Sequence, residues 1–365
     1  MYTSPIQNVE NEISMANSFD SFGLHAKVLD QISRRGYTTA THIQDQVIPH
    51  IMSKKDVIGL AQTGSGKTGS YLIPLLHNLV EREKSDSNKT ALIIVPTREL
   101  AFQVEKELWE FGIKYLGLYA VTCVGGMNIR QQITKLRKPN QFVIGTPGRL
   151  MDLAERNVLK LDTISTVVVD EVDRMLDMGF IDDINWIMDR IPTSRQGLFF
   201  SATFNKAIEP ILKRLAPDAS VIQIEGQKPS PFVEQTMLKI TNKREKMDAL
   251  LRLAETESQI KGLVFINTKN ETERVAQSFK DAGFQTVYLH GGRSQQSRLR
   301  TIKEFKKMKQ GFMVATDVAA RGLDIDDITH VFNYDEPQDV ETYIHRVGRT
   351  GRAGRYGKAV TLVAR

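Results

Sequence analysis

The chain of 365 residues is long enough for two domains of ordinary size, and its composition, 41% hydrophobic and 25% charged, is typical of a globular protein. A formal net charge of +6 and a sequence pI near 9.2 fit a polyanionic partner. The single cysteine, Cys123, excludes an internal disulfide and a multi-cysteine metal site, and no apolar run is long enough to cross a bilayer.

Residues 1–18 have no periodicity, and we expect them to form a mobile leader without an export signal. Together with the lone cysteine, this predicts a reducing, cytoplasmic location and no membrane association. The pattern becomes structured from Phe19. An amphipathic segment at residues 26–35 predicts one helix, and a second helix is expected to follow residues 39–44 and run through Ile51, before the first strand-like run, residues 57–60.

A phosphate-binding loop is predicted directly after this first strand. Two glycines let the backbone turn tightly and point its amides inward, and a helix-compatible run follows, which places a bound anion at a helix N-terminus. Lys67 would bind the β and γ phosphates of a nucleoside triphosphate, and the Thr68 hydroxyl would bind Mg²⁺. The residues assigned to nucleotide binding here are Ala61, Gln62, Thr63, Gly64, Ser65, Gly66, Lys67 and Thr68.

The loop is a variant of the strict motif, because Ala61 stands where a glycine is expected. Two other interpretations therefore stay open for the loop alone. Residues 64–69 also satisfy a dinucleotide fingerprint, although Lys89 stands where that fingerprint expects a carboxylate and the Lys-Thr pair has no role in it. A glycine-rich surface turn is the second alternative.

Two series of strand-like runs alternate with helical stretches along the rest of the chain. Their β-branched, continuously apolar character favours strands buried on both faces, hence mostly parallel sheets flanked by helices. The proline- and glycine-rich residues 223–233 predict a flexible linker between the two series. The predicted runs are residues 91–95, 120–124, 142–144, 166–169 and 198–201, then 263–266, 286–289, 311–315, 330–333 and 359–363.

We therefore predict an α/β fold with two tandem domains, residues 19–222 and residues 234–365. Only the first has a phosphate loop. The second is expected to complete the site of the first.

Three carboxylates, Asp170, Glu171 and Asp173, follow one predicted buried strand, at the edge where α/β sheets bind ligands. Asp170 can bind the Mg²⁺ that Thr68 also contacts, and Glu171 can orient and deprotonate an attacking water. A solvated acidic turn is the alternative, which the upstream phosphate loop makes less favourable.

The order of the motifs resembles that of the DEAD-box ATP-dependent RNA helicases of superfamily 2, which have two RecA-like domains. The resemblance runs from Phe19 almost to the C-terminus, and the name-giving tetrapeptide reads Asp-Glu-Val-Asp, with Val172 in place of alanine. Residues 173–180 and 290–295 resemble the bacterial RhlE-type members in particular. The matching positions are Phe19, Gln44 and residues 61–68, 96–100, 125–126, 146–149, 170–173, 201–203, 295–298, 315–324 and 345–352.

The resemblance implies how the nucleoside is recognised. Gln44 would form paired amide hydrogen bonds with the adenine edge, and Phe19 would pack against the base, so that ATP is preferred. Asp324 would contact the ribose.

The resemblance also implies catalytic roles. Arg349 and Arg352 would reach the γ phosphate from the second domain as arginine fingers. Ser201 and Thr203 would hydrogen-bond Asp173 and neighbouring groups, and so couple hydrolysis to strand separation.

An RNA-binding rim is implied on the opposite side of the site. Hydroxyls, glycine and arginines suit phosphates and 2′-hydroxyls, so binding should be largely independent of sequence and sensitive to salt. The basic residues 298–309 either extend this rim or form a solvated helix face. The implied RNA-binding residues are Thr97, Arg98, Gly126, Thr146, Arg149, Thr268, Arg293 and Thr316.

The function implied by the resemblance is RNA-stimulated ATP hydrolysis coupled to local unwinding of short duplexes or remodelling of RNA–protein complexes. We expect a monomer that uses ATP, Mg²⁺ and RNA. Two alternatives stay open, an ATP-gated RNA clamp that does not unwind and a DNA translocase of the same superfamily. Gln44 and Phe19, as an adenine-reading pair, argue against the translocase.

Overall fold

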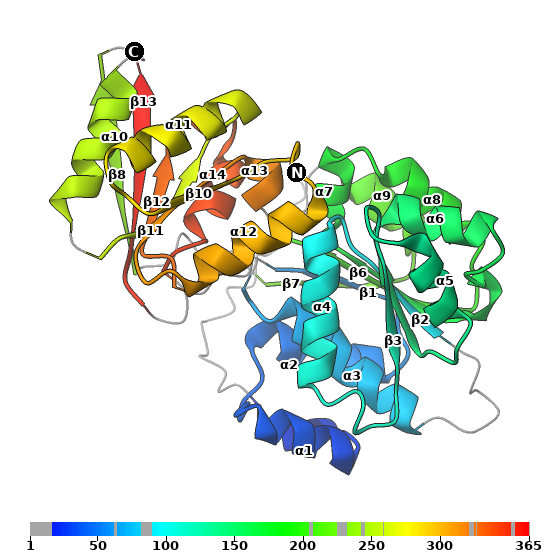
Figure 1. The fold of residues 1–365 in the computed structure, drawn as a ribbon. Helices are drawn as coiled ribbons and strands as arrows, with labels where there is room; N and C mark the ends of the chain where they lie inside the picture. Colours follow the sequence, from blue (N-terminus) through cyan, green and yellow to red (C-terminus); the bar gives the residue numbers. More distant parts are fainter. Residues whose placement is uncertain are drawn as a thin grey trace, which may run out of the picture.

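The structure, a computed structural model, describes residues 17–61, 64–81, 90–203, 207–224, 232–241, 245–257, 259–320, 325, 327–351 and 355–364. Figure 1 shows two α/β units side by side, the first coloured blue to green and the second yellow-green to red. Every strand pairing within the described residues is parallel. The predicted fold class, two parallel-sheet α/β domains with flanking helices, is therefore confirmed.

The first unit is built on a seven-stranded sheet in the order β3-β4-β2-β5-β6-β1-β7. Neighbouring strand residues such as Val167 and Val168 belong to different hydrophobic clusters, so both faces of the sheet are buried. The strands are β1 (Val57–Leu60), β2 (Thr90–Ile94), β3 (Ala120–Cys123), β4 (Phe142–Gly145), β5 (Ile164–Asp170), β6 (Gln196–Ser201) and β7 (Ser220–Gln223).

Helices cover each face of this sheet. One cluster packs α1 (Ala26–Arg34), α2 (His42–Met52), α3 (Lys67–Glu81) and α4 (Arg98–Glu110) on the sheet, with the short helix η1 (Phe19–Phe22) alongside. The other cluster packs α5 (Ile129–Leu136), α6 (Pro147–Glu155), α7 (Val172–Asp177), α8 (Ile181–Met188) and α9 (Glu209–Leu215), with η3 (Leu161–Thr163).

The second unit repeats this design on a six-stranded sheet in the order β10-β11-β9-β12-β13-β8. Its strands are β8 (Val233–Ile240), β9 (Lys261–Phe265), β10 (Thr286–Leu289), β11 (Gly311–Ala315), β12 (His330–Asn333) and β13 (Gly357–Ala364). One face packs against α10 (Glu245–Thr256) and α11 (Lys269–Asp281). The other packs against α12 (Gln295–Lys307), α13 (Asp317–Ala320) and α14 (Val340–Val347).

Two strands were not predicted from the sequence. Gln223, the last residue of β7, and Val233, the first of β8, fall inside the predicted linker but pair with β1 and β13. Both strands lie at sheet edges, where half of the side chains face water, so neither shows a continuous apolar run. Residues 225–231 of the predicted linker lie outside the described residues.

The predicted leader ends earlier than residue 18. Asn17 Nδ2 donates to Asp45 at 2.8 Å, and Ser18 forms a β-bridge with Thr39. Residues 1–16 lie outside the described part of the chain. Among the helices that the structure describes, none combines the length and apolarity needed to span a bilayer.

Candidate active site

The loop between β1 and α3 has the backbone of an anion-binding loop. Gly64 and Gly66 have φ angles of +86° and +94°, in the left-handed region that favours glycine. Because α3 begins at Lys67, the first amides of this helix have no partner within it and face the loop. Ser65 Oγ is buried and has no hydrogen-bond partner among the described residues. These unsatisfied donors fit the oxygens of a phosphate group.

Lys67 is buried under the same loop. The residue is 6% exposed, and its Nζ donates to the Ala61 carbonyl at 2.6 Å. Ala61 N in turn donates to the Ser201 carbonyl at 3.1 Å, so the loop is attached to the end of β6. The ammonium group is thereby held at the carboxyl edge of the sheet.

Gln44 joins the start of α2 to the phosphate loop. Its Oε1 accepts from Thr41 N at 2.9 Å in the capping box of α2, and its Nε2 donates to the Gly66 carbonyl at 3.1 Å. A Cβ at Gly66 or Gly69 would lie 2.8 or 2.7 Å from Gln44 Nε2, so glycine at both positions leaves room for this amide beside the loop. Phe19 is buried in the hydrophobic cluster to which α2 and α3 also contribute. Of the two predicted base-recognition residues, Gln44 therefore lies against the predicted phosphate loop.

Asp170 ends β5 and is only 3% exposed. Tyr71 Oη donates to its Oδ2 at 3.0 Å, and Glu171 N donates to its Oδ1 at 2.9 Å. Burial raises the pKa of the Asp170 carboxyl to about 6, although the Lys67 charge opposes the shift. Burial and the Asp170 charge also raise the pKa of Tyr71, whose hydroxyl interacts with the Thr68 side chain as well. The Tyr71 hydroxyl therefore binds Asp170 and is electrostatically coupled to Thr68, the two predicted metal-binding residues.

Glu171 has a backbone that non-glycine residues rarely adopt. Its φ is +57°, directly before the first turn of α7. Strain of this kind concentrates at functional sites. Glu171 Oε2 lies 3.1 Å from Arg174 Nη1.

The charges around Glu171 keep it ionised. Burial alone would raise the pKa of this carboxyl, but the cations of Arg174, Lys67 and Arg349 outweigh burial and lower it. An ionised carboxylate is the form that a general base requires. Since Arg349 belongs to the second unit, both units contribute charge at this position.

The ends of β5 and β6 are linked through Asp173. Its Oδ2 accepts from Ala202 N at 3.0 Å and from Thr203 Oγ1 at 3.4 Å. The predicted bond from Ser201 to Asp173 is not seen among the described residues. Ser201 Oγ instead accepts from Thr203 N at 3.4 Å.

The two units also meet through an ion pair. Arg298 Nε in α12 lies 2.8 Å from Glu99 Oε1 in α4, and the two side chains are 14% and 8% exposed. In Figure 1, α12 of the second unit lies close to α4 of the first. Burial lowers the pKa of Arg98, Glu99 raises it, and Arg298 and Arg149 lower it further. Arginines of both units therefore gather at this rim.

The predicted RNA-binding threonines all lie at the carboxyl ends of strands. Thr97 and Thr268 cap α4 and α11, and each accepts a hydrogen bond from an amide of the first turn. Thr146 precedes α6 and makes no side-chain cap bond, and Thr316 follows β11. Arg293 follows β10 and donates to a backbone carbonyl at the end of that strand, 3.1 Å away. Helix N-termini at one edge suit phosphate groups.

Arg98 and Gly126 touch within the same rim. Gly126 has a φ of +72°, and a Cβ there would lie 2.1 Å from Arg98 Nη1. Arg149 Nη1 donates to Gln132 Oε1 at 2.9 Å. Four predicted site residues, Gln62, Thr63, Asp324 and Arg352, lie outside the described residues.

Sequence reasoning missed two participants, Tyr71 and Arg174, and one contact between the units. Tyr71 stands four residues after Lys67, one helical turn along α3, and Arg174 stands three residues after Glu171. Helical spacing from a predicted catalytic residue was therefore the signal that would have found them. No such spacing links Glu99 to Arg298, because their contact depends on how the two units pack.

Two family models match the chain. One, described as DEAD/DEAH box helicase, matches residues 41–211, and the other, described as Helicase conserved C-terminal domain, matches residues 242–354. Together they cover more than half of the sequence.

Curated relatives are similar along most of the chain. The ATP-dependent RNA helicase CshA of Listeria monocytogenes is 43% identical over 94% of this chain and 66% of its own length. The DEAD-box ATP-dependent RNA helicase CshA of Bacillus subtilis is 40% identical over 96% of this chain and 70% of its own length. The chain thus spans about two thirds of the length of these relatives.

Solved structures share both units. S. cerevisiae Dbp5 bound to RNA and ADP BeF3 is 29% identical, with a TM-score of 0.85 over 96% of this chain and 90% of that one. Mss116p bound to ssRNA and AMP-PNP is 28% identical, with a TM-score of 0.87 over 97% and 76%. A DEAD box protein from the hyperthermophile Methanococcus jannaschii is 37% identical, yet its TM-score is 0.53 over 95% and 93%.

Proposed function

Because the chain belongs to the DEAD/DEAH box helicase family, we propose that it is an ATP-dependent RNA helicase core with one ATPase site divided between two domains. The observation that carries this proposal is the electrostatic setting of Glu171. Its pKa is lowered by Arg174 and Lys67 from the first unit and, to a smaller extent, by Arg349 from the second. A site assembled from both units links ATP turnover to their closure.

The similarity scores support a closed arrangement of the domains. TM-scores of 0.85 and 0.87 belong to structures with RNA and a nucleotide bound, whereas the more identical archaeal structure scores 0.53. Since all three share the two sheets, we attribute the difference to how the units are placed. The Arg298–Glu99 ion pair fits the closed placement.

ATP is the proposed nucleotide. Lys67 and the loop amides would bind its phosphates. The left-handed backbone at Gly64 and Gly66 turns the loop so that a bound phosphate would lie at the N-terminus of α3. Gln44 and Phe19 would hold the adenine, and Asp324 the ribose. The bond from Gln44 to the Gly66 carbonyl supports this arrangement, because it puts the amide beside the loop.

Asp170 and Thr68 are the residues that would hold Mg²⁺. Carboxylate and hydroxyl oxygens are ligands that this ion accepts; Asp170 binds the Tyr71 hydroxyl, to which Thr68 is electrostatically coupled. When bound, the ion neutralises charge on the phosphates.

For hydrolysis, Glu171 would orient the attacking water and take its proton, because its lowered pKa keeps it ionised. Arg349 and Arg352 would stabilise the charge that develops on the phosphate oxygens. Ser201 and Thr203 would couple ATP hydrolysis at the site to strand separation. The hydrogen bond from Thr203 to Asp173 supports this coupling.

RNA would lie along the rim of strand ends and arginines. The proposed contacts suit phosphates and 2′-hydroxyls, so a bound strand would be held largely without regard to its sequence. Closure would bend this strand away from duplex geometry and open short helices. The residues proposed for RNA binding are Thr97, Arg98, Gly126, Thr146, Arg149, Thr268, Arg293 and Thr316.

We propose two domains, one from Phe19 to the end of β7 and one from the start of β8, with residues 224–232 as the linker. A cytoplasmic monomer remains our expectation. The two relatives reported above are CshA proteins, so an RhlE-type assignment stays a prediction.

The test measures ATPase activity with RNA, with DNA of the same sequence and with neither, and then displacement of a short RNA duplex. We expect RNA, but not DNA, to stimulate the ATPase activity, and we expect release of the RNA strand to require ATP. Lys67→Ala is the inactive control. Equal turnover with and without RNA would contradict the proposal. Stimulation without displacement would favour a clamp, and equal stimulation by DNA would favour a translocase.

A further inference from the structure

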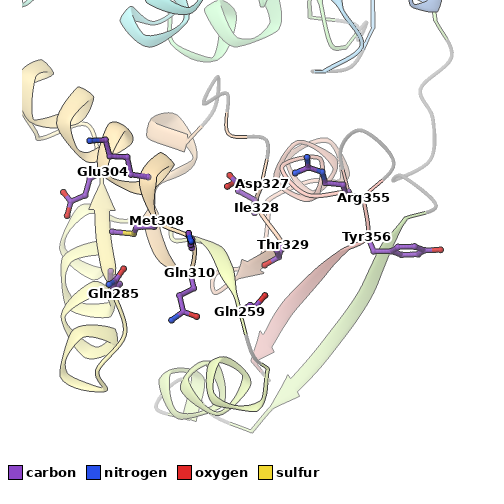
Figure 2. Close-up of a pocket in the computed structure, with 14 residues that line it drawn as sticks. Gln259, Gln285, Glu304, Met308, Gln310, Asp327, Ile328, Thr329, Arg355 and Tyr356 are labelled. Carbon is purple, nitrogen blue, oxygen red and sulfur yellow. The ribbon is translucent and has the colours of Figure 1, made fainter. Parts of the chain in front are cut away.

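A cavity of about 1000 Å³ opens in the second unit, away from the candidate active site. Its lining includes the residues just before five parallel strands, so it lies at the amino ends of the sheet, whereas the predicted RNA rim lies at the carboxyl ends. Figure 2 shows Glu304 and Met308 on one side of the cavity and Tyr356 on the other. The residues preceding the strands are Gln259, Gln285, Gln310, Thr329 and Tyr356.

The cavity is rich in cations. Lys307, Lys309 and Arg355 line it, and none of them forms a salt bridge with another described residue. Two carboxylates, Glu304 and Asp327, also line the cavity. Asp327 is paired with Lys261 at 2.7 Å, so Glu304 is the lining carboxylate that offsets the three cations. The surrounding sequence has the same bias, because residues 1–233 carry equal numbers of acidic and basic side chains and residues 234–365 carry the whole excess of +6.

The remaining lining suits a nucleobase. The amides of Gln259, Gln285 and Gln310 each offer donors and an acceptor, as the edges of bases do. Tyr356 is 83% exposed, and its ring is held edge-on by Phe232 with the centroids 5.6 Å apart. An exposed ring fixed in this way offers a surface for stacking.

Helix α12 connects the predicted RNA rim to the cavity. Its N-cap, Ser294, follows Arg293, and its last residue, Lys307, lines the cavity. Thirteen residues at 1.5 Å each span about 20 Å, which about six stacked nucleotides of one strand would cover. Exposed Arg300, Lys303 and Lys307 are three or four residues apart and therefore share one side of the helix.

We propose that this cavity is a second RNA subsite, which binds single-stranded RNA flanking the segment held at the rim. Phosphates pass along α12 to Lys307, Lys309 and Arg355, and a base stacks on Tyr356. The inference rests on the proposed function, since it extends the path of the RNA. An acidic protein segment is the competing occupant, which the experiment separates.

The experiment uses the full chain with an unhydrolysable ATP analogue and labelled oligouridylates of about 8 and about 20 nucleotides, the shorter within the size of one single-strand site and the longer beyond it. Binding is followed by fluorescence anisotropy at several salt concentrations. The test variants are Lys307→Gln with Lys309→Gln, and Tyr356→Ala. The matched control is Lys239→Gln with Arg252→Gln, which removes two exposed cations of the same unit outside the cavity lining.

We expect the long RNA to bind the unaltered chain more tightly than the short one. The logarithm of the affinity falls with the logarithm of the salt concentration, with a slope of about 0.7 per phosphate contact. Between 50 and 200 mM salt, the variant that lacks two contacts should therefore lose affinity for long RNA by a factor about sevenfold smaller than the unaltered chain. Tyr356→Ala should lower the affinity for long RNA by about fivefold or more, because a base loses the ring on which it stacks. The control should behave as the unaltered chain.

Short RNA separates this proposal from the proposed function, because it should stimulate the ATPase equally in all variants. If short RNA fails to stimulate the unaltered chain, the proposed function itself fails. If it stimulates but length adds no affinity, or the cavity variants bind long RNA like the control, the subsite is overturned. Competition by polyglutamate without any effect of RNA length would likewise overturn it, in favour of a protein partner.

Discussion

At the residue scale, the candidate site is held by buried hydrogen bonds rather than by solvent-exposed pairs. Asp170 accepts from Tyr71 and from the Glu171 amide, and Asp173 accepts from the end of β6. Buried acceptors of this kind are costly to leave without a donor. Substitutions that keep shape and remove one polar group are therefore the informative ones.

Glu171→Gln should bind ATP and lose turnover by about 100-fold or more, the usual contribution of a general base. Glutamine keeps the size of the side chain, but it cannot accept a proton from water. Fluorescent-nucleotide binding and ATPase rates with RNA measure the two effects. A variant with full ATPase activity would show that Glu171 is not the base.

Tyr71→Phe should impair use of Mg²⁺ and lower the free energy of unfolding by about 1 to 3 kcal/mol, because Asp170 Oδ2 loses its donor. The ring should stay packed against Phe200, with the centroids 5.2 Å apart. Urea unfolding and Mg²⁺ titration of nucleotide binding measure both effects. Tyr119→Phe, at an exposed ring, is the control. Unchanged Mg²⁺ dependence would leave Tyr71 with a packing role only.

At the element scale, the sequence predicted the buried strands well. The predicted runs at residues 286–289, 311–315 and 330–333 coincide with β10, β11 and β12, because strands covered on both faces are continuously apolar. Edge strands β7 and β8 escaped, since their exposed residues interrupt the apolar pattern.

The candidate site was predictable to the extent that it lies in local motifs. The loop before α3 and the carboxylates after β5 each have a chemical logic within a few residues. Contacts between distant elements have none, and the Glu99–Arg298 pair joins α4 to α12 across the two units. Only packing brings such residues together.

Glu99→Arg or Arg298→Glu alone should weaken domain closure by about 3 kcal/mol, since each places two like charges together in a nearly buried contact. RNA-stimulated ATPase should fall, while nucleotide binding by the first unit should persist. The exchanged pair, Glu99→Arg with Arg298→Glu, should recover part of the activity. Failure of the double variant to exceed both single variants would show that the ion pair does not govern closure.

At the scale of the whole molecule, neither unit contains all the groups of the proposed ATPase site. Lys67, Asp170 and Glu171 belong to the first unit, whereas Arg349 belongs to the second, two residues beyond the end of α14. Turnover should therefore depend on the second unit even when nucleotide binding does not.

Arg349→Ala should lower RNA-stimulated hydrolysis by about 1,000-fold, the lower range for an arginine finger, with ATP affinity nearly unchanged. Arg349 is buried, and its Nε donates to the His345 carbonyl, so a melting curve should accompany the kinetics. Loss of ATP affinity equal to the loss of rate would contradict the assignment, because the arginine would then act on the ground state.

The uneven distribution of charge has a kinetic consequence. Because the excess of +6 lies entirely in residues 234–365, long-range attraction aims an approaching polyanion at the second unit, while the first exerts little pull at a distance. Binding of the polyanion to the second unit and its later contact with the first unit are then separate events. The initial encounter should slow steeply with ionic strength, whereas the rearrangement that follows should keep its pace.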